Sequence, residues 1–187
     1  MEVSLHPSSR DFYVLTGGPG SGKSTLLDHL EGHGFARSIE AGRGIIQDQI
    51  AIGGPALPWR DRALFAELML SWDMRSYHAA LQRDGSEPVI FDRGVPDVLG
   101  YLRFEGLNVR SHIQRAAKSF RYNPRVFVAP PWPEIYTQDA ERKQDEETAH
   151  RTYEAMVIVY RELGYTLIEL PKASVAARAE FVRAQIG

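Results

Sequence analysis

Two kinds of apolar pattern alternate along the chain. Short apolar runs are typical of strands that are buried on both faces, and these runs span residues 12–16, 35–39, 88–92, 125–129 and 165–170. Longer stretches place apolar residues every three or four positions, as amphipathic helices do. The expected helices span residues 24–33, 42–52, 60–83, 96–105, 111–121, 148–163 and 174–185. The alternation of the two predicts an α/β fold.

The order of these elements predicts how they are layered. Strands separated by helices form a parallel sheet, and right-handed crossovers place helices on both of its faces. We therefore expect a three-layer sandwich around a five-stranded parallel sheet, with ligands bound at the carboxyl ends of the strands. No internal repeat or linker-like tract divides the chain, so one domain over residues 1–187 is expected.

A glycine-rich segment joins the first expected strand to the first expected helix. Gly17, four further residues and then Gly22-Lys23-Ser24 match the phosphate-binding P-loop pattern. Backbone N–H groups of such a loop face phosphate oxygens, and the start of the helix adds its positive dipole end. We expect Lys23 to neutralise the phosphates of ATP and Ser24 to ligate Mg²⁺. The expected nucleotide-binding residues are Gly17, Gly18, Pro19, Gly20, Ser21, Gly22, Lys23, Ser24 and Thr25.

Charged residues follow the second and third expected strands. Asp92 ends the third strand and Arg93 follows it; a carboxylate there can hold Mg²⁺ or its water, and the arginine can bind a phosphate. The simpler alternative is a helix cap beside a surface arginine, and Asp97 either supports the pair or only starts a helix. Glu40 ends the second strand one helical turn before Arg43, so both can face one cleft, unless Glu40 only caps the next helix.

A strongly charged segment, residues 139–151, lies between the fourth and fifth expected strands. Arg142 and Arg151 in this segment are candidates to reach a transferring phosphoryl group from a short helical lid, as arginine fingers do. Mixed charge is otherwise typical of a solvated helix face. The position of the segment after the fourth strand favours the lid.

These motifs together resemble a known family. They are the P-loop, Glu40-x-x-Arg43, Asp92-Arg93-Gly94-x-x-Asp97 and the segment from Pro130 to Arg142. From about residue 12 to residue 181 the chain is similar to small bacterial proteins known as AAA-type ATPases or predicted kinases, and more distantly to nucleoside and ribosylnicotinamide kinases. The resemblance implies a nucleoside-kinase-like fold, a lid at about residues 133–150 and ATP with Mg²⁺ as cofactors. The implied catalytic residues are Lys23, Glu40, Asp92, Arg93, Arg142 and Arg151, with Glu40 or Asp92 acting on the acceptor hydroxyl and with Ser24 and Asp92 on the metal.

The phosphoryl acceptor is expected between the helices that follow the second and third strands. Aromatic side chains there can stack on a base, and arginines can hold a phosphate or a carboxylate. The candidates are Trp59, Arg60, Arg62, Trp72, Arg75, Tyr77 and His78. Trp72 lies on an apolar stripe and is more typical of a core residue.

Composition excludes several other classes of protein. A formal net charge of −2 gives no general attraction to nucleic acid or to an anionic membrane, and no apolar stretch is long enough to span a bilayer. Without cysteine the chain has no disulfide scaffold, thiolate metal site or cysteine nucleophile. We expect a cytoplasmic protein whose partner is a small-molecule acceptor, and a homodimer is compatible with the sequence.

Two functions fit these motifs. The first is an ATP-dependent phosphotransferase, a kinase acting on a small metabolite such as a nucleoside or nucleotide. The alternative is a nucleotide-binding regulator or slow NTPase without a small-molecule acceptor. Both use the same P-loop residues, so acceptor-dependent formation of ADP is what separates them.

Overall fold

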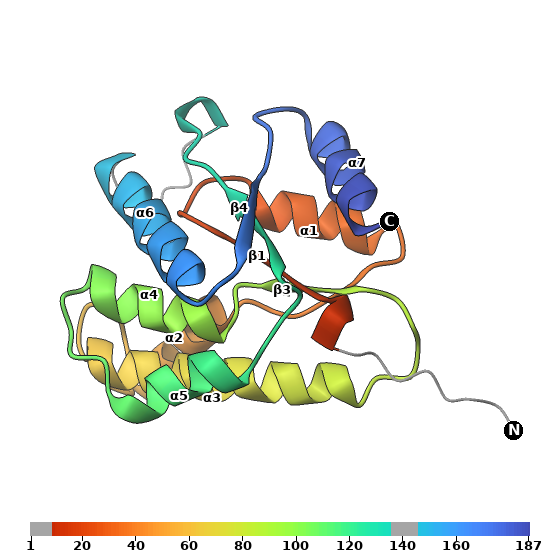
Figure 1. Cartoon of the computed structure of the whole chain (residues 1–187). Coiled ribbons are helices and arrows are strands. Elements are labelled where there is room, and N and C mark those ends of the chain that lie inside the picture. Colours follow the sequence, from red (N-terminus) through yellow and green to blue (C-terminus); the bar gives the residue numbers. More distant parts are fainter. Residues whose placement is uncertain (1–8, 136–145) are drawn as a thin grey trace, which may run out of the picture.

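The computed structural model of the protein describes residues 9–135 and 146–187 (Figure 1). The strands are β1 (Phe12–Gly17), β2 (Ala36–Arg37), β3 (Val89–Asp92), β4 (Arg125–Ala129) and β5 (Thr166–Glu169). The helices are α1 (Lys23–Glu31), α2 (Ala41–Ile52), α3 (Arg62–Leu81), α4 (Val95–Phe104), α5 (Ser111–Ser119), α6 (Glu146–Glu162) and α7 (Val175–Ile186). Short 3₁₀ turns occupy Ser9–Asp11 (η1) and Pro133–Ile135 (η2).

The strands form one parallel sheet in the order β2-β3-β1-β4-β5. The central strand β1 pairs with both β3 and β4, and Leu15 lies opposite Asp92 on one side and Phe127 on the other. The predicted five-stranded parallel sheet is therefore confirmed. Because the carboxyl ends of parallel strands share one edge, the P-loop after β1 lies beside the end of β3.

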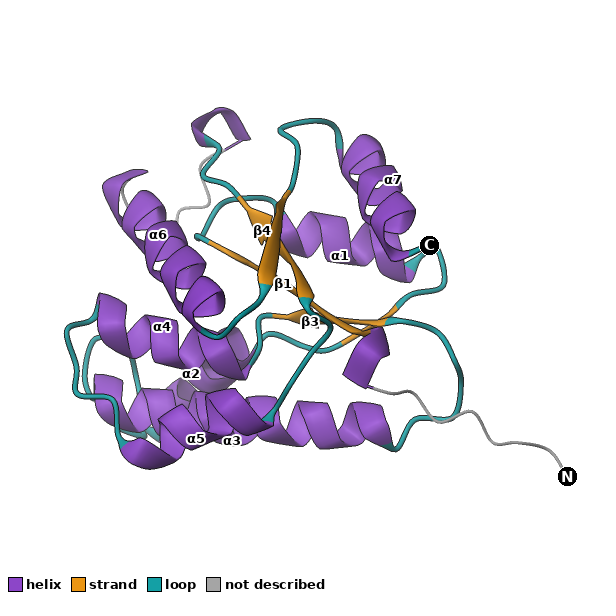
Figure 2. Cartoon of the chain, viewed as in Figure 1, coloured by secondary structure: helices purple, strands orange, loops and turns teal. Residues whose placement is uncertain are grey.

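Alternating side chains of the sheet enter two separate cores. Phe12 and Val14 of β1 belong to a cluster with residues of α3 and α6, whereas Tyr13 and Leu15 belong to a cluster with residues of α1 and α7. Figure 2 shows the same division, with α1 and α7 on one side of the strands and α2 to α6 on the other. This arrangement confirms the predicted three-layer sandwich.

Two expected elements differ from those observed. The edge strand β2 is shorter than the expected run at 35–39, and it pairs with β3 through Ala36 and Arg37. In α3 the apolar side chain of Leu64 is 39% exposed and does not belong to the buried face. The buried face is instead formed by the side chains Phe65, Ala66, Leu70, Asp73, Tyr77 and Ala80. An aspartate therefore lies on the face that the apolar pattern assigns to the core.

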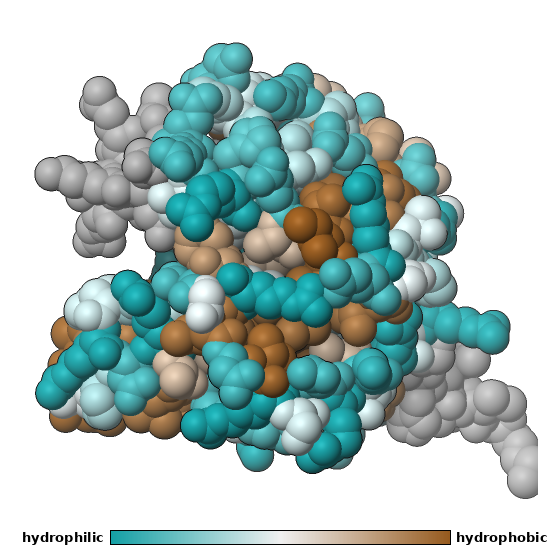
Figure 3. Space-filling view, turned by 60° about the vertical axis from the view of Figure 1, so that its left-hand side comes forward, coloured by the Kyte–Doolittle hydropathy of each residue, from teal (hydrophilic) through white to brown (hydrophobic). Residues whose placement is uncertain are grey.

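The outer surface carries both polar and apolar side chains. Figure 3 shows brown apolar patches between teal hydrophilic ridges, on the side of the molecule that lies at the left in Figure 1. The most exposed large apolar side chains include Ile50 and Ile52 on α2 and Trp59 in the α2–α3 connection. Within residues 9–135 and 146–187, no helix is long and apolar enough to cross a membrane.

Candidate functional site

The P-loop follows β1 directly and its glycines allow a fold that other residues could not adopt. At Gly17 a Cβ atom would lie 2.3 Å from the carbonyl oxygen of Ala129 on the neighbouring strand, where there is no room for it. Gly22, the residue before α1, has a φ of 72°, in the left-handed region that glycine tolerates best. Ser24 and Thr25 are exposed in the first turn of α1, so the Ser24 hydroxyl is free to meet a ligand.

Lys23 is held inside this loop rather than extended into solvent. Its side chain is only 8% exposed, and Nζ donates to the Gly18 carbonyl oxygen at 2.7 Å. Burial, together with the nearby guanidinium of Arg93, lowers the pKa of Lys23 to about 7, although three neighbouring carboxylates act in the opposite direction. The ammonium group is therefore only partly charged at neutral pH until an anion joins it.

Arg93 links the end of β3 to the residues beside it. Its Nε lies 3.3 Å from Glu40 Oε1 and its Nη1 lies 3.3 Å from Asp97 Oδ1. Burial by itself would lower the pKa of Arg93, but the carboxylates of Glu40 and Asp97 raise it above its ordinary value. Its φ of 68° costs about 1–3 kcal/mol in a residue other than glycine, and such strain clusters at functional sites.

Asp97 binds Arg93 and connects it by hydrogen bonds to the surrounding strands and helices. Its carboxylate accepts hydrogen bonds from Thr16 Oγ1 and the Tyr160 hydroxyl, both at 2.5 Å, and from the Gly94 N–H at 3.0 Å. The sequence left open whether Asp97 supports the Asp-Arg pair or only starts a helix. The structure shows both, because the carboxylate binds Arg93 and also caps α4.

Asp92 lies at the end of β3 with one oxygen unused. Its Oδ1 is buried and has no hydrogen-bond partner among the described residues. Burial raises the pKa of Asp92, and the charge of Glu40 raises it further, against the opposing charges of Lys23 and Arg93. A buried carboxylate oxygen without a partner is unfavourable by itself, so this atom fits a site that binds a cation or its water.

Glu40 immediately precedes α2 but does not cap it. Its side chain makes no capping hydrogen bond to that helix and instead binds Arg93. The alternative that Glu40 only caps the short helix is therefore wrong. Arg43, one turn further on, is exposed on the surface of α2.

Of the two candidate arginines of the lid, the structure describes Arg151 alone. Arg142 lies outside the described residues. Arg151 lies on α6, and its guanidinium carbon is 5.4 Å from the centre of the Phe104 ring at the end of α4. The first turn of α6 nevertheless touches the P-loop, because a Cβ atom at Gly18 would lie 2.5 Å from the Ala149 carbonyl oxygen.

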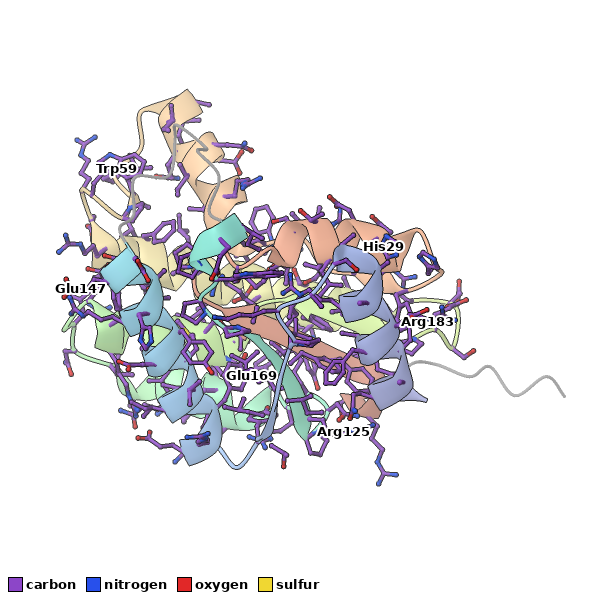
Figure 4. All side chains as sticks on the ribbon, turned by 90° about the horizontal axis from the view of Figure 1, so that it is seen from above. His29, Trp59, Arg125, Glu147, Glu169 and Arg183 are labelled. Carbon is purple, nitrogen blue, oxygen red and sulfur yellow. The ribbon has the colours of Figure 1, made fainter. Side chains whose placement is uncertain are left out.

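A hollow of about 280 Å³ opens where the lid region meets the P-loop. Its lining residues are Pro19, Pro131, Trp132, Pro133, Glu146 and Ala149. Seen from above the sheet, Glu147 at the start of α6 and Trp59 lie on one side of the molecule, whereas His29 and Arg183 lie on the other (Figure 4). The start of α6 therefore lies on the side of the α2–α3 connection.

Arg178 is a site residue that the sequence analysis missed. It is 3% exposed, and its guanidinium donates to the carbonyl oxygens of Ser21 at 3.0 Å and Gly22 at 3.5 Å, while stacking over Trp132 at 5.8 Å. Burial lowers its pKa. One signal was available: Arg178 lies in the first turn of α7, where the helix dipole disfavours a cation. Such a residue needs an anionic or carbonyl partner elsewhere.

Asp73 is the second residue that was missed. It lies on the buried face of α3 and is 7% exposed. Burial raises the pKa of Asp73 well above its ordinary value, and the charge of Asp97 raises it further while Arg93 opposes the rise. An acid on an apolar helix stripe is the sequence signal that could have found it.

The residues expected to surround the acceptor mostly lie elsewhere. Tyr77 is in the core, and Trp72 packs against Gly44 of α2 as its core interpretation predicted. Arg62 pairs with Glu105 at 3.1 Å. The remaining candidates, Trp59, Arg60, Arg75 and His78, are exposed. The structure does not bring these arginines to Glu40 and Arg93.

A parallel sheet with a P-loop after its central strand, and an Asp-Arg pair after the strand beside it, defines a P-loop protein with the kinase-like fold. The chain belongs to the family AAA_28, described as an AAA domain, whose model matches residues 12–178. No curated protein sequence matches the chain.

Solved structures resemble the fold over nearly the whole chain at low sequence identity. Deoxyadenosine kinase from M. mycoides is 12% identical, with a TM-score of 0.66 over 94% of this chain and 98% of that one. Thymidylate kinase from Ehrlichia chaffeensis is 12% identical, with a TM-score of 0.60 over 97% and 100%. Shikimate kinase from Acinetobacter baumannii is 15% identical, with a TM-score of 0.51 over 98% and 92%. All three are similar in fold.

Proposed function

We propose that the protein is an ATP-dependent kinase that phosphorylates a hydroxyl group of a small metabolite. The observation that carries this proposal is the ion-paired group of Glu40, Arg93 and Asp97 beside the P-loop lysine. A hydrolase needs only to position water, whereas a carboxylate beside a strained arginine suits a second substrate. The structural neighbours include kinases whose acceptors are small molecules, one of them with dCMP as a bound product.

The P-loop side would hold the nucleotide. Backbone N–H groups from Gly18 to Lys23 would surround its phosphates, and Lys23 would leave the Gly18 carbonyl oxygen for a phosphate oxygen. Ser24 and Asp92 would hold Mg²⁺, for which the unused Asp92 oxygen is suited. Bound Mg-ATP supplies the γ-phosphoryl group and departs as Mg-ADP.

Glu40 would act on the acceptor. In the transfer, a bond forms between the acceptor oxygen and the γ-phosphorus, the bond from that phosphorus to the ADP oxygen breaks, and the hydroxyl proton passes to Glu40. Arg93 holds the Glu40 carboxylate in place and would neutralise charge on the phosphoryl oxygens. Arg142 and Arg151 stay candidates for the same task from the lid.

The experiment that tests the proposal is formation of ADP from Mg-ATP with and without pools of acceptors. The pools contain nucleosides, nucleoside monophosphates, sugars, amino alcohols and hydroxy acids. Strong stimulation by one pool, together with a phosphorylated product found by mass spectrometry, supports a kinase. A slow rate that no pool changes contradicts the proposal and favours the regulator or slow NTPase.

A further inference from the structure

The proposed mechanism gives no role to Asp73, a buried acid on α3. Asp73 is 7% exposed in the middle of α3, and its carboxyl group makes no hydrogen bond to any of the described residues. Its oxygens are not among the fully buried atoms without a partner, so they remain accessible to a ligand. Burying a carboxyl group without a hydrogen-bond partner is strongly unfavourable. A stabilising core position would be better filled by an apolar residue, so the carboxyl group at this position calls for a ligand.

The helical face that carries Asp73 leads from Glu40 to the sheet. A Cβ atom at Gly42 would lie 4.0 Å from both Glu40 Oε1 and Met69 Sδ, so the Glu40 carboxylate and the Met69 turn of α3 both lie close to the first turn of α2. Asp73 follows Met69 by one turn on the same face. One turn further, Tyr77 packs on Phe91 at 6.3 Å between ring centres, directly below the end of β3. Asp73 therefore lies between the expected catalytic base and the floor of the site.

The ionisable groups around Asp73 include more carboxyl groups than cations. Asp97, Arg93, Asp92 and Glu40 all act on it electrostatically, from α4, the end of β3 and the start of α2. Lys23 experiences the same carboxylates from the P-loop side. The group thus contains four carboxyl groups and two cations.

Both cations are already committed. Lys23 serves the nucleotide phosphates in the proposed function, and Arg93 is shared between Glu40 and Asp97. Among residues 9–135 and 146–187, no other basic side chain is directed to this group for a phosphate on the acceptor, since Arg43, Arg60 and Arg75 are exposed and Arg62 is paired with Glu105. The carboxyl groups around Asp73 repel an anionic acceptor and attract a hydrogen-bond donor or a cation.

We propose that Asp73 selects the acceptor by accepting a hydrogen bond from its N–H or ammonium group, and that the acceptor carries no phosphate. This inference rests on the proposed kinase function and narrows its substrate to hydroxyl compounds with such a donor, nucleosides or amino alcohols. Burial favours the neutral form of the Asp73 carboxyl group, whereas an N–H or ammonium group that meets it favours the ionised form and makes a charge-assisted hydrogen bond. An acceptor without such a donor does not make this bond and is bound less well.

The test compares four acceptors that differ in these features. Deoxycytidine and ethanolamine represent the class with a donor and without phosphate, ribose lacks the N–H donor, and dCMP adds a phosphate. We expect the first class to be phosphorylated with a kcat/KM about 100-fold above that of ribose or dCMP. In Asp73→Asn the KM for the favoured acceptor should rise about 10-fold or more, with a smaller change in the KM for ATP. Asp84→Asn, an exposed matched control on the α3–β3 connection, should behave as wild type.

Some outcomes of this test contradict the role of Asp73, and others contradict the proposed kinase function. Phosphorylation of ribose or dCMP as efficient as that of the first class overturns the role of Asp73 and leaves the kinase standing. Unchanged acceptor KM in a folded Asp73→Asn does the same. No stimulation by any acceptor contradicts the proposed function itself. If Asp73→Asn does not fold, thermal shift of the wild type with ADP decides: stabilisation by ribose or dCMP equal to that by deoxycytidine or ethanolamine contradicts the inference.

Discussion

The two sides of the site are built in different ways. On the proposed phosphate side, contiguous residues 17–25 form a loop whose backbone would do most of the binding, and α7 supports it through Arg178. On the proposed acceptor side, Arg93 after β3 joins Glu40 before α2 to Asp97 of α4. Local backbone geometry thus builds the first side, whereas the second requires side chains from distant parts of the chain.

Lys23→Ala tests the phosphate side with the largest expected effect. Removing a buried ammonium that balances phosphate charge should lower turnover by about 10³-fold and weaken nucleotide binding. The measurement is ADP formation together with binding of Mg-ADP by calorimetry. Lys118→Ala, on the exposed surface of α5, is the matched control. Turnover close to wild type in Lys23→Ala would contradict the P-loop account.

Glu40→Gln tests the acceptor side. The amide keeps the shape but cannot take a proton, so kcat should fall about 10²-fold while the KM for ATP changes little. Steady-state kinetics with a saturating acceptor measures both values, and Glu87→Gln on an exposed loop is the control. A normal kcat would transfer the role of base to Asp92.

The pKa of Lys23 gives a pH dependence of nucleotide binding, although charged groups of the acceptor side contribute to that pKa. The folded protein holds this pKa near 7, below the ordinary value of 10.5, so the lysine loses its proton as pH rises through 7. Phosphate favours the charged form, and binding at pH 8 should therefore take up about one proton. The Kd for Mg-ADP should rise about 50-fold between pH 7 and 9. Calorimetry in buffers of different ionisation enthalpy measures the proton; no uptake would refute the shift.

Arg178→Gln has the smallest expected effect and shows how far the loop depends on its support. Losing the guanidinium bonds to the Ser21 and Gly22 carbonyl oxygens should raise the KM for ATP about 5-fold and leave acceptor selectivity unaltered. The control is Arg183→Gln, exposed on the same helix (Figure 4). A change in acceptor preference would show that the two sides are not separable.

The sequence by itself determined what depends on local pattern. Apolar periodicity gave the parallel sheet and its helices, and the spacing of Gly17, Gly22 and Lys23 gave the phosphate loop, because both follow from backbone geometry over a few residues. The Asp92-Arg93 pair was also visible, since it follows a strand directly.

Only the tertiary structure decided which distant side chains meet. Glu40 binds Arg93, Asp97 binds Thr16 and Tyr160, and Arg178 binds the P-loop. These contacts join residues 53 to 157 positions apart, and no local pattern encodes them. Asp73 has the same origin, because only packing reveals that its helical face points toward the charged group instead of solvent. Burial then fixed the charge states, since desolvation is a property of the folded surroundings and not of the sequence.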